Sequence, residues 1–74
     1  MMRYFKQYKE INAIPFEITK EEARKTLEGH WIEDAVNDIF ENDRQFRLFT
    51  PFSTVWTMDE NGKVPMAGFY GILY

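Results

Sequence analysis

Apolar residues recur at helical spacing in the middle of the chain and at a spacing of two in the segments on either side. The apolar positions of the helical pattern are Trp31, Ile32, Ala35, Val36, Ile39 and Phe40. The opposite half of the same helix is acidic and carries Glu33, Asp34, Asp38 and Glu41. We therefore predict an amphipathic helix that packs its apolar half against a core and turns its carboxylates to water.

A second helical signal lies just upstream. Thr19 and Glu22 have the spacing of a capping box, so we expect a helix to begin at Lys20. In such a box the threonine hydroxyl accepts from the backbone N–H of the glutamate, and the glutamate carboxylate accepts from the backbone N–H of the threonine. Gly29 is a natural stop for that helix. We favour two helices, or one bent at Gly29. One continuous helix over residues 20–42 is the alternative, because apolar residues at intervals of four continue through the glycine.

The flanking segments read as strands. Residues 2–9 are rich in aromatic strand formers, and residues 10–16, which contain Pro15, read as a connection. From Gln45 onward apolar and polar residues alternate, and the pattern resumes over residues 53–58 after an interruption at Pro51.

A hairpin is predicted next, because Asn61-Gly62 suits a two-residue turn with Glu60 opposite Lys63. The remaining residues, 64–74, read as a further strand. The order strand, helices, strands predicts an α+β fold with the helices on one face of a mostly antiparallel sheet of three or four strands. We expect residues 1–74 to form a single small domain with a core rich in rings, because the chain contains two Trp, four Tyr and seven Phe.

Composition narrows the class of protein. The net charge is −3, which opposes a broad nucleic-acid footprint, and no apolar run is long enough to span a bilayer, so we expect no membrane partner. The chain has no cysteine, which removes disulfides and thiolate metal sites. The first residues, Met-Met-Arg-Tyr-Phe-Lys, do not resemble a signal peptide. We therefore expect an intracellular, cytoplasmic protein.

The sequence contains little evidence for a catalytic site or for a site that binds a cofactor or metal. His30 and Glu33 are three residues apart and are the best pair for a metal. A metal site needs three or four ligands, so we favour an ordinary histidine at a helix junction. No glycine-rich loop precedes a helix, and no nucleophile has an identifiable base. We expect neither an enzyme nor a bound cofactor or metal.

Two functions from different classes remain. The first is a protein-interaction or regulatory domain that uses an aromatic patch and the acidic residues Glu33, Asp34, Asp38 and Glu41, with a basic protein as partner or a second copy paired along the 64–74 strand. A plain solvated surface is the ordinary explanation of those acids.

The second function is related to nucleic acid. Arginine and lysine residues interleave with aromatic ones near the predicted strands, so a single strand could stack on a face that carries Arg3, Lys6, Arg44 and Arg47. The rings considered for this face are Tyr4, Tyr8, Phe46, Phe49, Phe52, Trp56, Phe69 and Tyr70, and a role in the core is the ordinary explanation of rings at alternating positions. In a variant of this hypothesis the acidic helix imitates a phosphate backbone and inhibits a DNA-binding protein.

Overall fold

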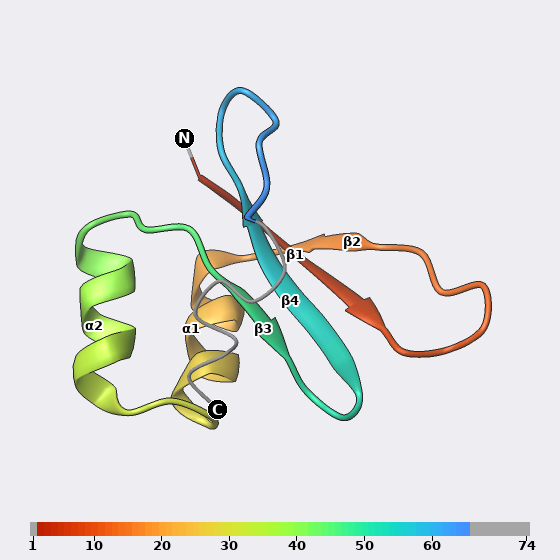
Figure 1. The fold of residues 1–74 in the computed structure, drawn as a ribbon, viewed down its shortest axis with the longest axis horizontal. Coiled ribbons are helices and arrows are strands. Elements are labelled where there is room, and N and C mark those ends of the chain that lie inside the picture. Colours follow the sequence, from red (N-terminus) through yellow and green to blue (C-terminus); the bar gives the residue numbers. More distant parts are fainter. Residues whose placement is uncertain (1, 66–74) are drawn as a thin grey trace.

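The structure is a computed structural model that describes residues 2–65, in which two helices and four strands are formed. In chain order these elements are β1 (Arg3–Tyr8), β2 (Phe16–Ile18), α1 (Lys20–Glu28), α2 (Glu33–Glu41), β3 (Arg47–Phe49) and β4 (Ser53–Met58). The strands form one antiparallel sheet in the order β2-β1-β4-β3, and both helices lie on one side of it (Figure 1). The predicted α+β class, with helices on one face of an antiparallel sheet, is confirmed.

The strand register divides the sheet into two faces, since residues paired across neighbouring strands point to the same side. Tyr4 pairs with Thr57, and both side chains are buried under the helices. The next pair, Phe5 and Trp56, points to the other side. We call that side the helix-free face; its strand residues are Arg3, Phe5, Gln7, Glu17, Arg47, Phe49, Thr54, Trp56 and Met58.

Strand β2 is not predicted by the sequence pattern, and it begins at Phe16, the last residue of the expected connection. It pairs with β1 over only three positions, from Tyr4 opposite Ile18 to Lys6 opposite Phe16. Three residues are too few to display an alternating pattern, and the pairing depends on contacts that are distant in sequence. The strand predicted over residues 64–74 lies outside the described residues, except for Val64 and Pro65, which are not in a strand.

The N-cap predicted at Thr19 is confirmed, whereas the return hydrogen bond of the capping box, from the Thr19 N–H to the Glu22 carboxylate, is not formed. The backbone N–H of Glu22 donates to the Thr19 hydroxyl at 3.1 Å, and that hydroxyl lies 3.4 Å from the Glu22 carboxylate. Thr19 has an extended backbone, and the helix begins at Lys20. The cap satisfies one of the backbone donors that every helix leaves unpaired at its first turn.

The favoured prediction of two helices is also confirmed, although the first helix does not end at Gly29 in the way that was expected. Gly29 has φ −79° and ψ −9°, a right-handed conformation that any residue can adopt. The chain turns because the N–H of Trp31 bonds back to the carbonyl of Leu27 at 2.8 Å and the Trp31 side chain is buried, after which Ile32 is extended. Packing of the tryptophan, rather than glycine geometry, therefore separates the helices.

Ile32 is the position where the helical-wheel prediction is wrong. It precedes α2 as its N-cap, so it does not follow the helical period, and its side chain is 69% exposed with no capping hydrogen bond. Replacing Ile32 by serine should raise the free energy of unfolding by about 1 kcal/mol, because serine supplies the missing acceptor and little apolar contact is lost. Urea denaturation measures the change. Ile32→Ala is the control, and equal stability of the two variants would contradict this assignment of the cap.

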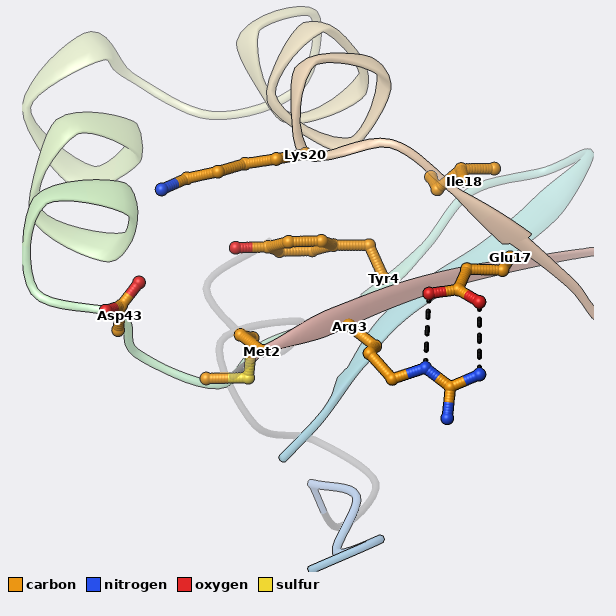
Figure 2. A pocket seen from close by; sticks show the side chains of 7 residues that line it. All are labelled: Met2, Arg3, Tyr4, Glu17, Ile18, Lys20 and Asp43. Atoms are coloured by element: carbon orange, nitrogen blue, oxygen red, sulfur yellow. Dashed lines mark hydrogen bonds and ion pairs between the residues drawn. The ribbon is translucent and has the colours of Figure 1, made fainter. Parts of the chain in front are cut away.

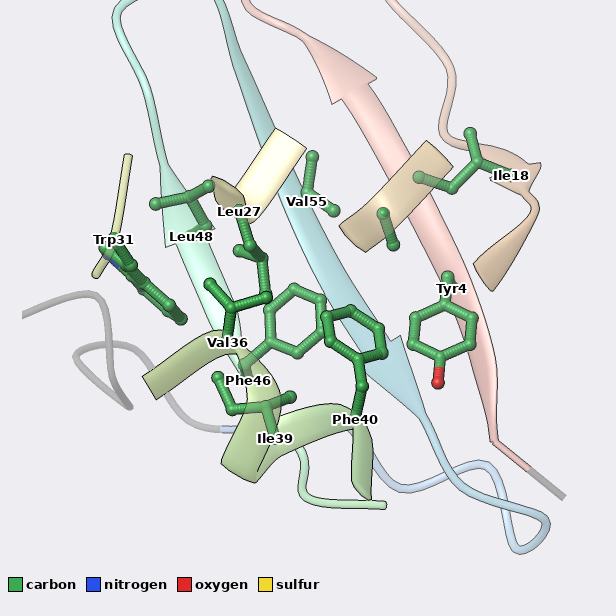
Figure 3. Close-up of a cluster of buried hydrophobic side chains, with 11 residues drawn as sticks. Tyr4, Ile18, Leu27, Trp31, Val36, Ile39, Phe40, Phe46, Leu48 and Val55 are labelled. Atoms are coloured by element: carbon green, nitrogen blue, oxygen red, sulfur yellow. The ribbon is translucent and has the colours of Figure 1, made fainter. Parts of the chain in front are cut away.

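The hydrophobic core lies between the helices and the sheet, and Phe46 is at its centre (Figure 3). The Phe46 side chain is fully buried, and its ring centroid lies 5.9 Å from that of Phe40 and 6.2 Å from those of Tyr4 and Trp31. Residues from the sheet and both helices complete the cluster: Ile18, Ala23, Leu27, Val36, Ile39, Leu48 and Val55. The prediction that α2 turns its apolar half inward is confirmed for Val36, Ile39 and Phe40.

The turn after β4 differs from the two-residue loop that Asn61-Gly62 predicted. The N–H of Asp59 donates to the carbonyl of Lys63 at 3.0 Å, so three residues form the loop. The Asp59 carboxylate accepts from the N–H groups of Asn61 and Lys63 at 2.9 and 2.8 Å. Gly62 has φ 81°, the left-handed conformation that three-residue hairpin loops require. The aspartate side chain therefore sets this turn.

Helix α2 ends in a Schellman motif, with the N–H of Arg44 bonded to the carbonyl of Ile39 at 3.0 Å. The motif needs a left-handed residue after the C-cap, and that residue is Asp43, with φ 48°. Glycine is the usual residue at this position, and an anion at the C-terminal end of a helix opposes the helix dipole. Asp43 therefore costs stability on two counts.

Candidate functional site

The four acidic residues predicted as a partner surface lie on one side of α2 and none is buried. Glu33, Asp34 and Glu41 are exposed. Asp38 forms an ion pair with Arg44, with 2.7 Å between Oδ2 and Nε, and both side chains are about half exposed. An exposed pair of this kind contributes little to stability. The arrangement provides a negative surface that a basic molecule can approach.

The four cations predicted as a nucleic-acid face are not brought together. Arg3 and Arg47 lie on the helix-free face, whereas the register puts Lys6 on the side of Tyr4 and Val55. The Lys6 ammonium lies 5.0 Å from the centroid of the Tyr8 ring. Arg44 follows α2 and pairs with Asp38. The prediction of a single face carrying all four cations is therefore wrong, because successive residues of a strand point to opposite sides.

The aromatic rings of the stacking hypothesis are also divided. Tyr4 and Phe46 belong to the core, Phe49 and Trp56 lie on the helix-free face, and Phe69 and Tyr70 lie outside the described residues. On the helix-free face the rings of Phe5 and Trp56 stack, with centroids 6.0 Å apart and an interplanar angle of 18°.

The two arginines of the helix-free face already make contacts within the protein. Arg47 lies 5.7 Å from the Trp56 ring centroid and 5.5 Å from that of Phe49, and its Nη1 donates to the carbonyl of Pro65 at 3.4 Å. Arg3 lies over the Phe5 ring at 5.0 Å and donates two hydrogen bonds to the Glu17 carboxylate. These hydrogen bonds lower the pKa of Glu17 and raise that of Arg3. The guanidinium groups therefore occupy ring faces that a stacked base would need.

Exposed apolar side chains gather at the end of the sheet where β1 meets β2 and β3 meets β4. Ile11, Ile14 and Phe52 are 92%, 79% and 77% exposed, and Tyr8 and Phe16 are partly exposed beside them. We call these five residues the loop end. The two loops touch, because the N–H of Lys9 donates to the carbonyl of Phe52 at 2.9 Å. In Figure 1 the β1–β2 loop projects away from the helices.

The β1–β2 loop is ordered by its own hydrogen bonds. Gln7 Nε2 donates to the carbonyl of Ala13 at 3.0 Å, and the N–H of Ala13 donates to the carbonyl of Glu10 at 3.2 Å. Asn12 takes the left-handed conformation that the turn requires, with φ 66°. A shallow cavity of about 440 Å³ beside the loop is lined by Gln7, Tyr8, Lys9, Glu10, Ile11 and Thr54. The loop end therefore combines projecting apolar side chains with a shallow cavity that could receive a side chain of another molecule.

A second cavity of about 440 Å³ lies beside the start of β1 and the end of β2, next to the first residue of α1 and the loop after α2 (Figure 2). Its lining residues are Met2, Arg3, Tyr4, Glu17, Ile18, Lys20 and Asp43, and we call it the Tyr4 cavity. The side chains of Lys20 and Asp43 extend toward the space around the Tyr4 hydroxyl (Figure 2). Burial of the ring, and then the nearby Asp43 carboxylate, raise the pKa of Tyr4, so the hydroxyl stays protonated near neutral pH.

The structure supports a structural role for His30. Its Nδ1 lies 3.0 Å from the carbonyl of Thr26, one turn earlier in the chain, and its side chain is exposed. Within residues 2–65 no group of three or more histidine, cysteine, aspartate or glutamate residues could hold a metal ion.

The chain matches no protein-family model, no curated protein and no solved structure. Neither helix of the described part is long and apolar enough to cross a bilayer. Sequence reasoning missed Ile11 and Ile14, whose only signal is that two isoleucines stand in a segment read as a connection. It also missed the Tyr4 cavity, whose residues are distant in sequence.

Proposed function

We propose that this chain is a small protein-interaction domain, with a regulatory or accessory role, that binds a partner protein through the loop end. The observation that carries the proposal is the exposure of Ile11, Ile14 and Phe52 on two adjoining loops. Contiguous exposed apolar side chains on a small protein mark interaction sites. Complete burial of one such side chain in an interface contributes about 1.5–3 kcal/mol, so three of them can anchor a complex.

The ordering of the loop supports the same proposal. A flexible loop loses conformational entropy when it binds, which weakens the complex. The hydrogen bonds of Gln7 and Ala13 already hold the β1–β2 loop, so Ile11 and Ile14 are presented with little further ordering. The neighbouring rings of Tyr8 and Phe16, with centroids 5.8 Å apart, add the aromatic surface that is common at interface hot spots.

The acidic side of α2 supports a basic partner. Glu33, Asp34 and Glu41 are exposed and form no ion pair within residues 2–65. A negative surface accelerates association with a positive molecule and selects against an acidic one. We propose a cytoplasmic location and a partner that is either a basic protein or a second copy of the chain.

Affinity capture with paired variants tests this proposal. The tagged wild type, Ile11→Asp/Ile14→Asp and Ile32→Asp are compared for the proteins that each retains. Ile32 is the matched control, because it is also an exposed isoleucine but belongs to the start of α2. We expect the double variant to lose the partner and Ile32→Asp to keep it, with both variants folded by circular dichroism. Sedimentation of the purified chain tests whether a second copy is that partner.

Retention of the partner by the double variant would contradict the proposal. If, instead, the reversal Asp34→Lys/Asp38→Lys abolished capture of a DNA-binding protein and the double variant did not, mimicry of nucleic acid by α2 would replace it.

A second candidate function is binding of single-stranded nucleic acid on the helix-free face, favoured by the stacked rings of Phe5 and Trp56 on the two central strands. Rings in the centre of an open sheet can stack bases. Titration of a labelled oligonucleotide separates this function from the first, because it predicts an affinity that falls with salt and is lost in Trp56→Ala. The contacts of Arg3 and Arg47 within the protein make it the weaker candidate.

A further inference from the structure

We propose that the Tyr4 cavity binds a small zwitterion, of which an apolar α-amino acid is the simplest form. This site is separate from the loop end and does not depend on the proposed function. The volume of about 440 Å³ lies in the range of small-molecule sites, roughly 300–1,000 Å³. The residues that carry the inference are Lys20, Asp43 and Tyr4, which supply one cation, one anion and one hydroxyl.

The polar groups of these three side chains are available to a ligand. Among residues 2–65, the Lys20 ammonium, the Asp43 carboxylate and the Tyr4 hydroxyl form no hydrogen bond or ion pair with the protein. The two other charged residues of the lining, Arg3 and Glu17, are bonded to each other at 3.0 and 3.1 Å. The cavity therefore has one open position for an anionic group and one for a cationic group.

The dipoles of the two helices add to the separation of positive and negative charge in the cavity. Because α1 and α2 are joined by a short turn and run back past each other, the N-terminal end of α1 and the C-terminal end of α2 both lie at the cavity (Figures 1 and 2). The first end carries partial positive charge and the second partial negative charge. Lys20 is the first residue of α1 and Asp43 follows α2, so each side chain adds to the sign of its own helix end.

Each charge is placed where it costs stability. A cation at a helix N-terminus and an anion at a C-terminus both oppose the helix dipole. Asp43 also occupies the left-handed position where glycine is usual. Two residues that break local rules and line the same cavity are typical of a functional site, where stability is given up for binding.

The arrangement defines the ligand. A carboxylate would accept from the Lys20 ammonium and the Tyr4 hydroxyl, and an ammonium would donate to the Asp43 carboxylate. Met2 and Ile18 supply apolar surface in the same lining for the side chain of the ligand. Tyr4 is held by its core contacts with Phe40 and Phe46, with ring centroids 5.9 and 6.2 Å away, so its hydroxyl is preorganised.

The test is an NMR titration of the ¹⁵N-labelled full chain with L-leucine, L-methionine and L-phenylalanine. We expect shift changes gathered at the amides of Tyr4, Lys20 and Asp43. N-acetyl-leucine lacks the ammonium and leucinamide lacks the carboxylate, so each should bind at least about tenfold more weakly than leucine. Lys20→Gln, Asp43→Asn and Tyr4→Phe should each weaken leucine binding by about tenfold or more, whereas Lys25→Gln, at the other end of α1, should not.

Weaker binding by these variants would not be explained by loss of the folded state. Lys20→Gln and Asp43→Asn remove charges that oppose the helix dipoles, and asparagine tolerates the left-handed conformation, so both variants should melt at or above the wild-type temperature. The inference is overturned if none of the three amino acids shifts the cavity amides up to about 50 mM, or if they bind equally to the wild type and to all three cavity variants.

Discussion

Replacing Phe46 by alanine is expected to lower the free energy of unfolding by about 3–5 kcal/mol. The side chain is fully buried, and its ring meets those of Tyr4, Trp31 and Phe40, which come from β1, the interhelical turn and α2. A domain of this size has a total stability of about 4–11 kcal/mol, so the substitution should remove about a third or more of it.

Urea denaturation followed by circular dichroism measures this loss. Phe49→Ala is the matched control, because Phe49 is only three residues further along the chain but lies partly exposed on the helix-free face. We expect a cost of about 1 kcal/mol for it. Equal effects of the two substitutions would mean that the core is not centred on Phe46.

Replacing Thr50 by valine should cost about 2–3 kcal/mol, although the two side chains have nearly the same shape. The Thr50 hydroxyl is buried between β3 and β4, where it accepts from the N–H groups of Ser53 and Phe52 at 2.9 and 3.2 Å. It also donates to the carbonyl of Ser53 at 3.0 Å. Valine would leave backbone donors in the turn without this partner, which is more costly than the loss of a solvated hydrogen bond.

Loss of the turn between β3 and β4 should also affect the loop end, because the carbonyl of Phe52 accepts a hydrogen bond from the N–H of Lys9. Hydrogen exchange of the Ser53 and Lys9 amides should therefore accelerate together in Thr50→Val. Thr50→Ser keeps the hydroxyl and should stay within about 1 kcal/mol of the wild type. A valine variant as stable as the serine variant would show that these hydrogen bonds do not hold the turn.

Elements with a local signal could be predicted from the sequence. The start of α1 depends on Thr19 and Glu22, which are three residues apart, and α2 has a clear helical period. Strand β2 could not be predicted, because its three residues gain their place only by pairing with β1. The turn at Asp59 was misassigned because a side chain competes with the backbone for the same N–H groups.

The candidate sites were predictable only in part. The acids of α2 follow from periodicity, so their outward placement could be foreseen. The four cations could not be assigned to one face without the strand register, which separates Lys6 from Arg3 and Arg47. The Tyr4 cavity joins the first strand, the start of α1 and the end of α2, and no pattern within one segment reports such a contact.

Methyl NMR of the isoleucine residues tests the interaction surface most directly. Ile11, Ile14 and Ile32 are exposed, whereas Ile18 and Ile39 are buried. One spectrum recorded with a soluble paramagnetic probe therefore contains both exposed and buried isoleucine methyl groups for comparison. In the isolated chain the first three methyl signals should broaden and the last two should not. In the complex with the captured partner we expect Ile11 and Ile14 to become protected while Ile32 stays accessible. Protection of Ile32 with continued broadening of Ile11 and Ile14 would contradict binding at the loop end.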